Sequence, residues 1–421
     1  MNNSNCYKYN KIMLQKQQYN DIIFNSHACG VKSVVIKIEG CVMLIGVPKE
    51  IKNHEYRVGM TPASVREVVH SGHSVLVETL AGSGIGSSDD DYITAGAEIV
   101  LTAEEVFARA EMIVKVKEPQ AAERAMLRPE QVLFTYLHLA PDALQTADLV
   151  ASGATCIAYE TITSAQGGLP LLAPMSEVAG RMSIQAGAHV LEKAQGGRGM
   201  LLGGVPGVAP AKVVIIGGGV VGSNAAQMAL GARAQVTVLD RSTQALARLD
   251  KEFNGAVKTV YSTQDSLEEY VLDADLVIGG VLIPGAAAPK LVTETMVKAM
   301  KLGSVLVDVA IDQGGCFETS KATTHEDPTY VVHGVVHYCV ANMPGGVAMT
   351  STYALNNATL PYILKLANVG WKQALKQDEH FLAGLNVHAG KVTNQYVAEA
   401  LGYDYLPPET AVADISAKLV A

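Results

Sequence analysis

The chain of 421 residues lacks several features that mark particular classes of protein. Its six cysteines show no Cys-x-x-Cys spacing, and no block of Lys and Arg interrupts a net charge of −9. No apolar run approaches the roughly 18 residues of a membrane span. These absences argue against a nucleic-acid partner and a membrane protein, and they predict a reduced, cytoplasmic protein. With 49% hydrophobic and 17% charged residues, the composition is that of a globular chain with a sizeable core.

Residues 1–42 differ in character from the rest of the chain. They are rich in Asn, Lys, Tyr, Gln and Ile, and they show no helical or strand period. They lack the apolar segment of a secretory signal and the arginines of a transit peptide. We interpret them as a non-native or disordered extension, with Met43 as the functional start; a docked arm is the alternative.

The stretch 211–240 has the pattern of a dinucleotide site. A β-branched strand-like run leads into a turn with Gly217, Gly219 and Gly222, then an Ala-rich helical pattern, then a second strand ending in Asp240. Glycines allow a tight turn, and the helix N-terminus that follows attracts a pyrophosphate. The stretch therefore predicts a bound dinucleotide.

The residue at the end of the second strand indicates which dinucleotide binds. The carboxylate of Asp240 can accept hydrogen bonds from the ribose diol and repel a 2′-phosphate, which favours NAD over NADP. Arg241 beside it could instead meet such a phosphate.

Strand-like runs alternate with helical patterns from Met43 onward, which is typical of a mainly parallel sheet. We expect an α/β fold of two domains, each with a mainly parallel sheet flanked by helices. A Rossmann-type NAD-binding domain, residues 173–347, is expected to be inserted into a discontinuous substrate domain, residues 43–172 and 348–421. Residues 349–375 are expected to form one long helix.

Two other motifs resemble ligand sites without the supporting pattern. The loop AGSGIG at 81–86 runs into three aspartates that would repel a pyrophosphate, so we interpret it as loop geometry. His333 and His337, with Cys339 nearby, have metal-like spacing, but the surrounding valines indicate a strand. A four-residue step along a strand spans about 13 Å, too far for two imidazoles to share an ion. We expect a structural role and no metal.

Three polar residues lie at the ends of apolar strands: Lys117, His138 and Asp312. With Arg57, which lies in the loop KNHEYRVGMTP and has a weaker pattern, they form the candidate reaction site. Each has a simpler interpretation, such as a solvated lysine, a core histidine or a turn-forming aspartate. Together, however, they supply what hydride transfer on a small anionic substrate requires. These requirements are a cation for the carboxylate, a group that transfers protons near neutral pH, and a carboxylate that orients water.

Several segments closely resemble the NAD-dependent alanine dehydrogenase family, which includes transhydrogenase alpha subunits. They are MLIGVPKEIKNHEYRVGMTP, VKVKEP, FTYLHLA, LPLLAPMSEVAGR, GGGVVG, VDVAIDQGG and ANMPGGVAMTSTYALNNATLPY. The resemblance runs from Met43 almost to the C-terminus. It implies oxidative deamination of L-alanine to pyruvate and ammonium with NAD, and the reverse reaction.

The resemblance also implies roles for individual residues. Arg57 and Lys117 would bind the substrate carboxylate and carbonyl region, His138 would be the general acid and base, and Asp312 would orient the exchanging water or ammonia. The residues implied to line the NAD cleft are Ser176, Asp240, Asn342 and Met343, with the glycine turn beneath the pyrophosphate. Similar enzymes are homohexamers, so a homo-oligomer is implied.

Three other functions are alternatives to this interpretation. The chain could be the soluble NAD-binding component of a transhydrogenase, or a saccharopine-type dehydrogenase acting on a larger amino acid. It could also be a catalytically silent NAD-binding regulatory protein.

Overall fold

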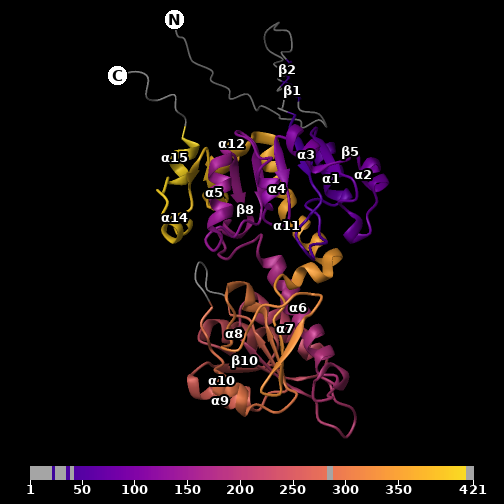
Figure 1. Ribbon diagram of the computed structural model, residues 1–421, viewed down its shortest axis with the longest axis vertical. Coiled ribbons are helices and arrows are strands. Elements are labelled where there is room, and N and C mark those ends of the chain that lie inside the picture. Colours follow the sequence, from indigo (N-terminus) through magenta and orange to yellow (C-terminus); the bar gives the residue numbers. More distant parts are fainter. Residues whose placement is uncertain (1–20, 24–34, 38–41, 282–287, 414–421) are drawn as a thin grey trace, which may run out of the picture.

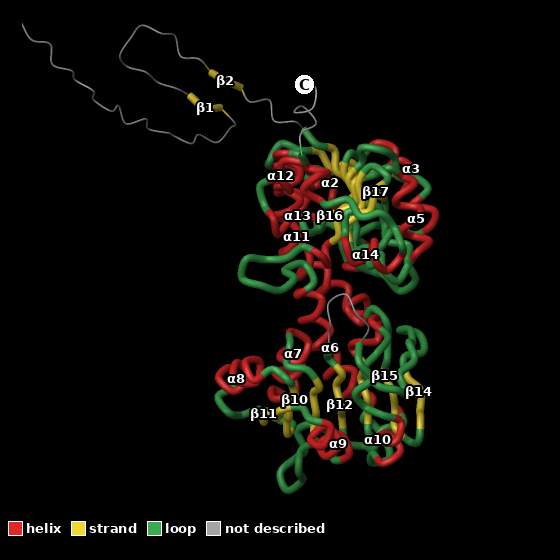
Figure 2. The backbone as a smooth tube through the Cα atoms, turned by 90° about the vertical axis from the view of Figure 1, so that its left-hand side faces the viewer, coloured by secondary structure: helices red, strands yellow, loops and turns green. Residues whose placement is uncertain are grey.

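The computed structural model describes residues 21–23, 35–37, 42–281 and 288–413. It has two lobes, each built around one sheet, and helices α6 and α11 run between them (Figures 1 and 2). Strand β1 (Asp21–Ile23) pairs antiparallel with β2 (Val35–Lys37). The expectation of a disordered extension otherwise concerns residues that lie outside the described ranges.

The first lobe contains an eight-stranded sheet of order β17-β16-β8-β7-β6-β3-β4-β5. The strands are β3 (Leu44–Val47), β4 (Ser74–Glu78), β5 (Glu98–Val100), β6 (Met112–Val114), β7 (Val132–Thr135), β8 (Thr155–Ala158), β16 (Leu385–His388) and β17 (Lys391–Val392). Strands β3 to β8 pair in parallel, whereas β16 and β17 join the edge antiparallel. The C-terminal part of the chain therefore returns to the first sheet with strands, and not only with the helices that we expected.

The second lobe contains a seven-stranded sheet of order β11-β10-β9-β12-β13-β15-β14. The strands are β9 (Lys212–Ile216), β10 (Gln235–Asp240), β11 (Lys258–Tyr261), β12 (Leu276–Gly279), β13 (Val305–Asp308), β14 (Thr329–Val332) and β15 (Val335–Tyr338). Within this sheet the β14–β15 pair is antiparallel and the other pairs are parallel. The expected fold class, two mainly parallel sheets flanked by helices, is confirmed.

Helices cover both sheets, and their starts follow from local sequence. In the first lobe they are α1 (Pro62–His70), α2 (Asp89–Ala95), α3 (Ala103–Arg109), α4 (Ala121–Arg124), α5 (Ala143–Ser152), α12 (Trp371–Lys376), α13 (Glu379–Leu382), α14 (Gln395–Leu401) and α15 (Pro408–Val412). In the second they are α7 (Val220–Gly231), α8 (Thr243–Glu252), α9 (Gln264–Leu272) and α10 (Glu294–Ala299). Thr61 caps α1: its side chain accepts from the Ser64 amide, and Pro62 stands in the first turn. No helix among the described residues combines the length and apolarity needed to cross a membrane.

Helices α6 (Ala173–Val190) and α11 (Ala348–Val369) pack against each other where the lobes meet. Helix α6 also packs on α7 of the second lobe, where a Cβ at Gly180 would lie 2.3 Å from the carbonyl oxygen of Val221. Only glycine permits this approach of one helix to another. The segment LPLLAPMSEVAGR is therefore, in part, a helix-packing motif.

The expectation of one helix over 349–375 is wrong at Gly370. This residue has φ 74° and ψ 153°, a conformation that a helix does not contain, so the chain stops α11 at Val369 and restarts as α12. Pro361, by contrast, lies inside α11 without ending it.

The expectation of one strand through His333 and His337 is also wrong. His333 and Gly334 both have positive φ and form the turn between β14 and β15. The two imidazoles have separate partners, because His333 Nε2 lies 2.8 Å from Glu294 and His337 Nε2 lies 2.7 Å from the Thr319 hydroxyl. The acidic run after AGSGIG likewise has a local role: Ser88 and Asp91 form the capping box of α2.

A buried ionic cluster lies beneath the loops at the carboxyl end of the first sheet. Lys115 Nζ, fully buried just after β6, donates to Glu50 Oε2 at 3.2 Å and to Glu123 Oε1 at 2.6 Å. Burial raises the pKa of Glu50 to about 7, even though the charge of Lys115 opposes the shift. Burial alone would lower the pKa of Lys115, but Glu50 and Glu123 raise it. The cluster thus ties the β3–α1 loop and α4 to the end of β6.

This cluster predicts a specific pH dependence of stability. The pKa of Glu50 lies near 4.5 when unperturbed and about 7 in the fold, so the folded chain binds this proton more tightly than the unfolded chain. The stabilisation is complete below the unfolded value and is lost as the pH rises through the folded value. The glutamine of Glu50→Gln cannot titrate. The difference in Tm, that of Glu50→Gln minus that of the wild type, should therefore become more positive as the pH rises from about 5 to about 8.

Differential scanning fluorimetry of both proteins across this range measures the difference. Glu67→Gln, which changes an exposed glutamate of α1, is the matched control, and its Tm difference should not depend on pH. A constant difference for Glu50→Gln would contradict the assignment of the proton to Glu50.

Candidate functional site

The carboxyl ends of the two sheets meet at a chain of hydrogen bonds. Arg57 lies in the loop after β3, Asp312 in the 3-10 turn η4 (Val309–Gln313) after β13, and Asn342 in the segment after β15. Arg57 Nη2 donates to Asn342 Oδ1 at 2.9 Å, and the backbone nitrogen of Asn342 donates to Asp312 Oδ1 at 3.3 Å. The structure therefore brings three sequence-predicted residues together from both lobes.

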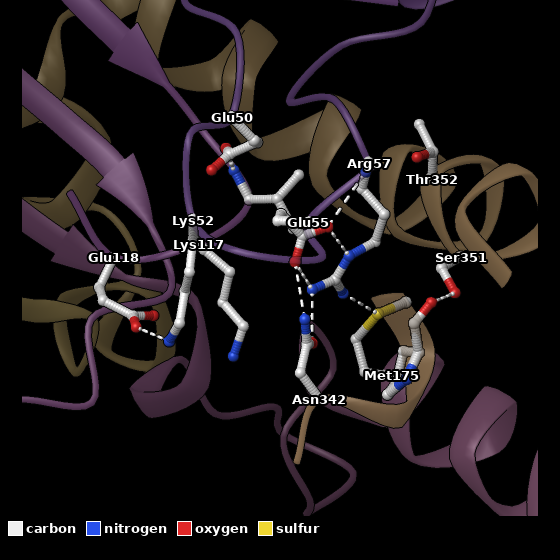
Figure 3. Close-up of polar contacts among 12 residues, drawn as sticks. Glu50, Lys52, Glu55, Arg57, Lys117, Glu118, Met175, Asn342, Ser351 and Thr352 are labelled. Carbon is white, nitrogen blue, oxygen red and sulfur yellow. Dashed lines mark hydrogen bonds and ion pairs between the residues drawn. The ribbon is translucent and has the colours of Figure 1, made fainter. Parts of the chain in front are cut away.

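Arg57 is buried, with 2% of its surface exposed, and most of its donors are occupied (Figure 3). Its Nε and Nη2 donate to the Glu55 carboxylate at 2.7 and 2.5 Å, and its Nη1 lies 3.0 Å from Met175 Sδ. Burial alone would raise the pKa of Glu55, but the hydrogen bonds and charge of Arg57 lower it to about 2. The pair is thus ionised. Since a thioether is a weak acceptor, Nη1 is the donor of Arg57 that a stronger acceptor, such as a carboxylate, could take.

Lys117 follows β6 and lies beside this network. Its Nζ makes no hydrogen bond within the part of the chain that the structure describes, whereas the neighbouring Lys52 and Glu118 form an ion pair. Burial alone would raise the pKa of Glu118, but the charges of Lys117 and Lys52 lower it. In Figure 3 the Lys117 and Lys52 side chains extend in the same direction, on the side where Asn342 lies. Lys117 is therefore a cation available to an anionic ligand.

His138 follows β7 in a left-handed conformation, with φ 51°, and its side chain is 46% exposed. Its amide nitrogen donates to Glu160 Oε1 at 2.6 Å, and its ring stacks on Tyr136 at a centroid distance of 5.9 Å. In the described residues it has no direct hydrogen bond to Arg57 or Asp312. The buried Tyr136 contacts the histidine ring and is also within electrostatic range of Arg57.

The glycine turn after β9 has the geometry that a pyrophosphate requires. Gly217 has φ 102°, and a Cβ at Gly222 would lie 1.8 Å from the Gly217 carbonyl oxygen. Gly219 is exposed at the N-terminus of α7, and a Cβ there would meet nothing within 4 Å. Gly217 and Gly222 thus permit the turn itself. Gly219 leaves open space at the N-terminus of α7, where an anion is favoured.

Asp240 is anchored to this turn. Its Oδ2 accepts from the Gly218 amide at 2.6 Å, and its Oδ1 accepts from the Ser242 amide at 2.7 Å. The side chain is half-buried, and each carboxylate oxygen keeps a lone pair for a ribose hydroxyl. Asp240 can therefore hold the turn and contact a ribose at the same time.

The remaining predicted residues occupy different environments. Ser176 lies half-buried in the first turns of α6, next to Met175, which touches Arg57. Met343 is only 3% exposed and packs in the hydrophobic core around the second sheet. The Met343 side chain thus contributes to packing.

Sequence reasoning did not select three acidic residues that hold the site together. Glu55 binds Arg57, Glu160 binds the backbone at His138, and the buried Asp308 accepts from the Cys316 amide at 2.9 Å and from Ser320 Oγ at 2.5 Å. Asp308 thereby closes the loop that carries Asp312. Asp308 ends β13, Glu160 lies two residues after β8, and Glu55 lies two residues before Arg57. These positions were the available signal.

A glycine turn with open space at a helix N-terminus lies in one lobe, and cationic and acidic strand-end residues converge from both. This is the organisation of a nicotinamide-dependent oxidoreductase. Family models agree: the model of the N-terminal domain of alanine dehydrogenase/PNT matches residues 46–179, and that of the C-terminal domain matches residues 183–395. The chain belongs to the alanine dehydrogenase/PNT family.

Individual relatives show the same similarity over nearly their whole length. The chain is 65% identical to the alanine dehydrogenase of Halomonas elongata over 364 residues, which are 86% of this chain and 98% of the relative. A solved L-alanine dehydrogenase is 54% identical with a TM-score of 0.83, over 86% of this chain and 99% of the other. A transhydrogenase structure from Sinorhizobium meliloti is 26% identical with a TM-score of 0.72, over 84% and 99%.

The glycine turn gives a paired prediction. Gly222→Ala places a methyl group against the Gly217 carbonyl, so it should lower Tm by several degrees and abolish NADH binding. Gly219→Ala meets no protein atom, so its Tm should stay within about 1 °C, while its affinity for NADH falls about tenfold or more as the methyl group enters the phosphate space.

Thermal unfolding and titration of NADH fluorescence measure the two effects separately. Gly231→Ala, at the far end of α7 with open space around its Cβ, is the matched control and should change neither. Wild-type NADH affinity in Gly219→Ala would show that the pyrophosphate lies elsewhere.

Proposed function

We propose that this protein catalyses the NAD-dependent oxidative deamination of L-alanine to pyruvate and ammonium, and the reverse reductive amination. The observation that carries the proposal is the hydrogen-bonded chain from Arg57 through Asn342 to Asp312. Through it a guanidinium of the first lobe is linked to an acid of the second, which supports a reaction site shared between the lobes. Similarity to alanine dehydrogenases over the whole fold supports the choice of substrate.

Arg57 and Lys117 bind the anionic end of the substrate in this proposal. Because Glu55 neutralises Arg57, the uncompensated charge comes from Lys117, and Arg57 contributes directed donors from Nη1. Lys117 also polarises C2 of the substrate, which favours hydride transfer to and from that carbon.

The glycine turn, Asp240 and Ser176 hold the cofactor, which when bound exchanges a hydride with C2 of the substrate. L-alanine gives up a proton from its ammonium nitrogen and the hydride from C2, which leaves an iminium group. Asp312 orients the water that adds to C2, and His138 takes the proton from this water and returns one to the departing ammonia. The exposure of the His138 ring and Asp312 leaves both accessible to a small substrate.

A transhydrogenase component and a silent NAD-binding protein are less well supported. The similarity to the transhydrogenase structure is 26% identity, against 54% to the L-alanine dehydrogenase structure. A silent binder has no need of a left-handed histidine held by Glu160. The saccharopine-type alternative gains no support from the relatives.

The same proposal includes several finer assignments. Asp240 makes NAD the preferred cofactor, residues 43–172 and 348–421 form the substrate domain, and residues 173–347 form the cofactor domain. The family resemblance favours a homohexamer. The free thiols Cys156, Cys316 and Cys339 favour a reducing compartment, and we therefore place the enzyme in the cytoplasm.

The first test is spectrophotometric. The purified protein should reduce NAD with L-alanine and oxidise NADH with pyruvate and ammonium. His138→Ala should lose 100-fold or more of kcat, about what general acid–base catalysis contributes, and should keep its NADH affinity because the ring does not touch the glycine turn.

A wild-type protein that binds NADH in calorimetry but turns over neither substrate pair would overturn the proposed function. Near-normal kcat in His138→Ala would remove the acid–base assignment alone. His189→Ala, at an exposed site near the end of α6, is the control histidine.

The cofactor preference is tested by Asp240→Asn, which removes the charge and keeps one acceptor oxygen. The ratio of kcat/KM for NADP to that for NAD should rise about tenfold or more, because a 2′-phosphate no longer meets a carboxylate. Asp250→Asn, exposed on α8, should leave the ratio unchanged. If Asp240→Asn also leaves it unchanged, the acid does not select the cofactor.

A further inference from the structure

Glu55 is an enclosed acid at the junction of the two lobes. Its side chain is 0% exposed, and its carboxylate accepts four hydrogen bonds. Three come from the amide nitrogen, Nε and Nη2 of Arg57, and the fourth comes from Asn342 Nδ2 at 2.9 Å. No other part of the carboxylate is available to a ligand in this arrangement, so Glu55 does not itself touch substrate.

The side chains of Glu55, Arg57 and Asn342 form a closed ring, since each of the three is hydrogen-bonded to the other two (Figure 3). The side-on pair of Glu55 with Nε and Nη2 fixes the plane of the guanidinium. The side chain of Asn342 completes the ring from the second lobe, and the backbone nitrogen of Asn342 donates to Asp312. The Glu55 carboxylate thus orients Arg57 in the first lobe and Asn342 in the second.

The charge of Glu55 is part of this role. A guanidinium that is 2% exposed is costly without a counter-ion, and Glu55 lies at contact distance. Without the carboxylate, Nε loses its acceptor, Nη2 keeps only Asn342 Oδ1, and Asn342 loses one of its two partners in the ring. The Nη1 corner that receives the substrate would then no longer have a fixed direction.

We propose that Glu55 is a positioning residue for substrate recognition: it holds Arg57 and Asn342 in the geometry that binds the substrate carboxylate. This rests on the proposed function. Because ammonium carries no carboxylate, the loss of Glu55 should affect the two substrates of reductive amination differently, which a general loss of structure would not do.

The experiment compares Glu55→Gln with the wild type in reductive amination. We expect the KM for pyruvate to rise about tenfold or more, as for a lost charge-assisted contact, while the KM for ammonium and the Kd for NADH change less than about threefold. Glu55→Asp keeps the charge but is one methylene shorter, so its KM for pyruvate should lie between those of the wild type and of Glu55→Gln. This variant also tests the proposal if Glu55→Gln does not fold.

The matched control is Glu123→Gln, which removes an equally buried carboxylate from Lys115, outside the ring. It should lower Tm and leave the KM for pyruvate unchanged. An unchanged or lower KM for pyruvate in Glu55→Gln would overturn the proposal, and so would a parallel rise in both KM values. A wild-type KM for pyruvate in Glu55→Asp would overturn it as well.

The outcome is separable from the proposed function. If the wild type turns over neither L-alanine nor pyruvate, the proposed function fails first. If the wild type is active and the KM for pyruvate does not respond to Glu55, only the positioning role fails.

Discussion

The site depends on one constraint, which is that the carboxyl ends of two mainly parallel sheets meet. Loops after parallel strands emerge at the same edge, so each sheet presents several polar side chains together. Helices α6 and α11 pack where the lobes join, and Gly180 lets α6 approach α7 closely. Arg57 and Asp312 belong to different sheets, and Asn342 connects them directly. Reaction chemistry and cofactor binding can therefore be shared between lobes that are far apart in sequence.

This constraint explains which parts of the fold and of the candidate site could be predicted from the sequence. Strands, caps and the glycine turn follow from local patterns. The strand-end rule selects Asp312, whereas Arg57 was chosen as the cation that an anionic substrate requires. The partners of these residues do not follow from local patterns, because Asn342 is 285 residues from Arg57. The break at Gly370 was also missed, since a periodic pattern does not reveal that a single glycine takes a non-helical φ. The turn at His333 was missed for the same reason.

The acids that sequence reasoning overlooked share a physical role. Glu55, Glu160 and Asp308 each accept from two or more donors in a segment that carries a candidate catalytic or binding residue. A buried carboxylate is costly unless its oxygens are satisfied, and loops have unpaired amides to satisfy them. The acids thus order loops that lack a regular ladder of hydrogen bonds. Their spacing from the selected residues varies, so no single motif identifies them.

The pairing of carboxylates with loop amides also accounts for the left-handed backbone conformation of two residues of the candidate site. His138 and Asn342 have φ of 51° and 61°, values that glycine adopts at lower cost. Glycine, however, has no imidazole or amide to offer the site. Each of the two residues donates its amide hydrogen to a carboxylate, Glu160 for His138 and Asp312 for Asn342. A charge-assisted hydrogen bond is comparable in size to the roughly 1 kcal/mol of left-handed strain, so the acids make it possible to keep functional side chains at these turns.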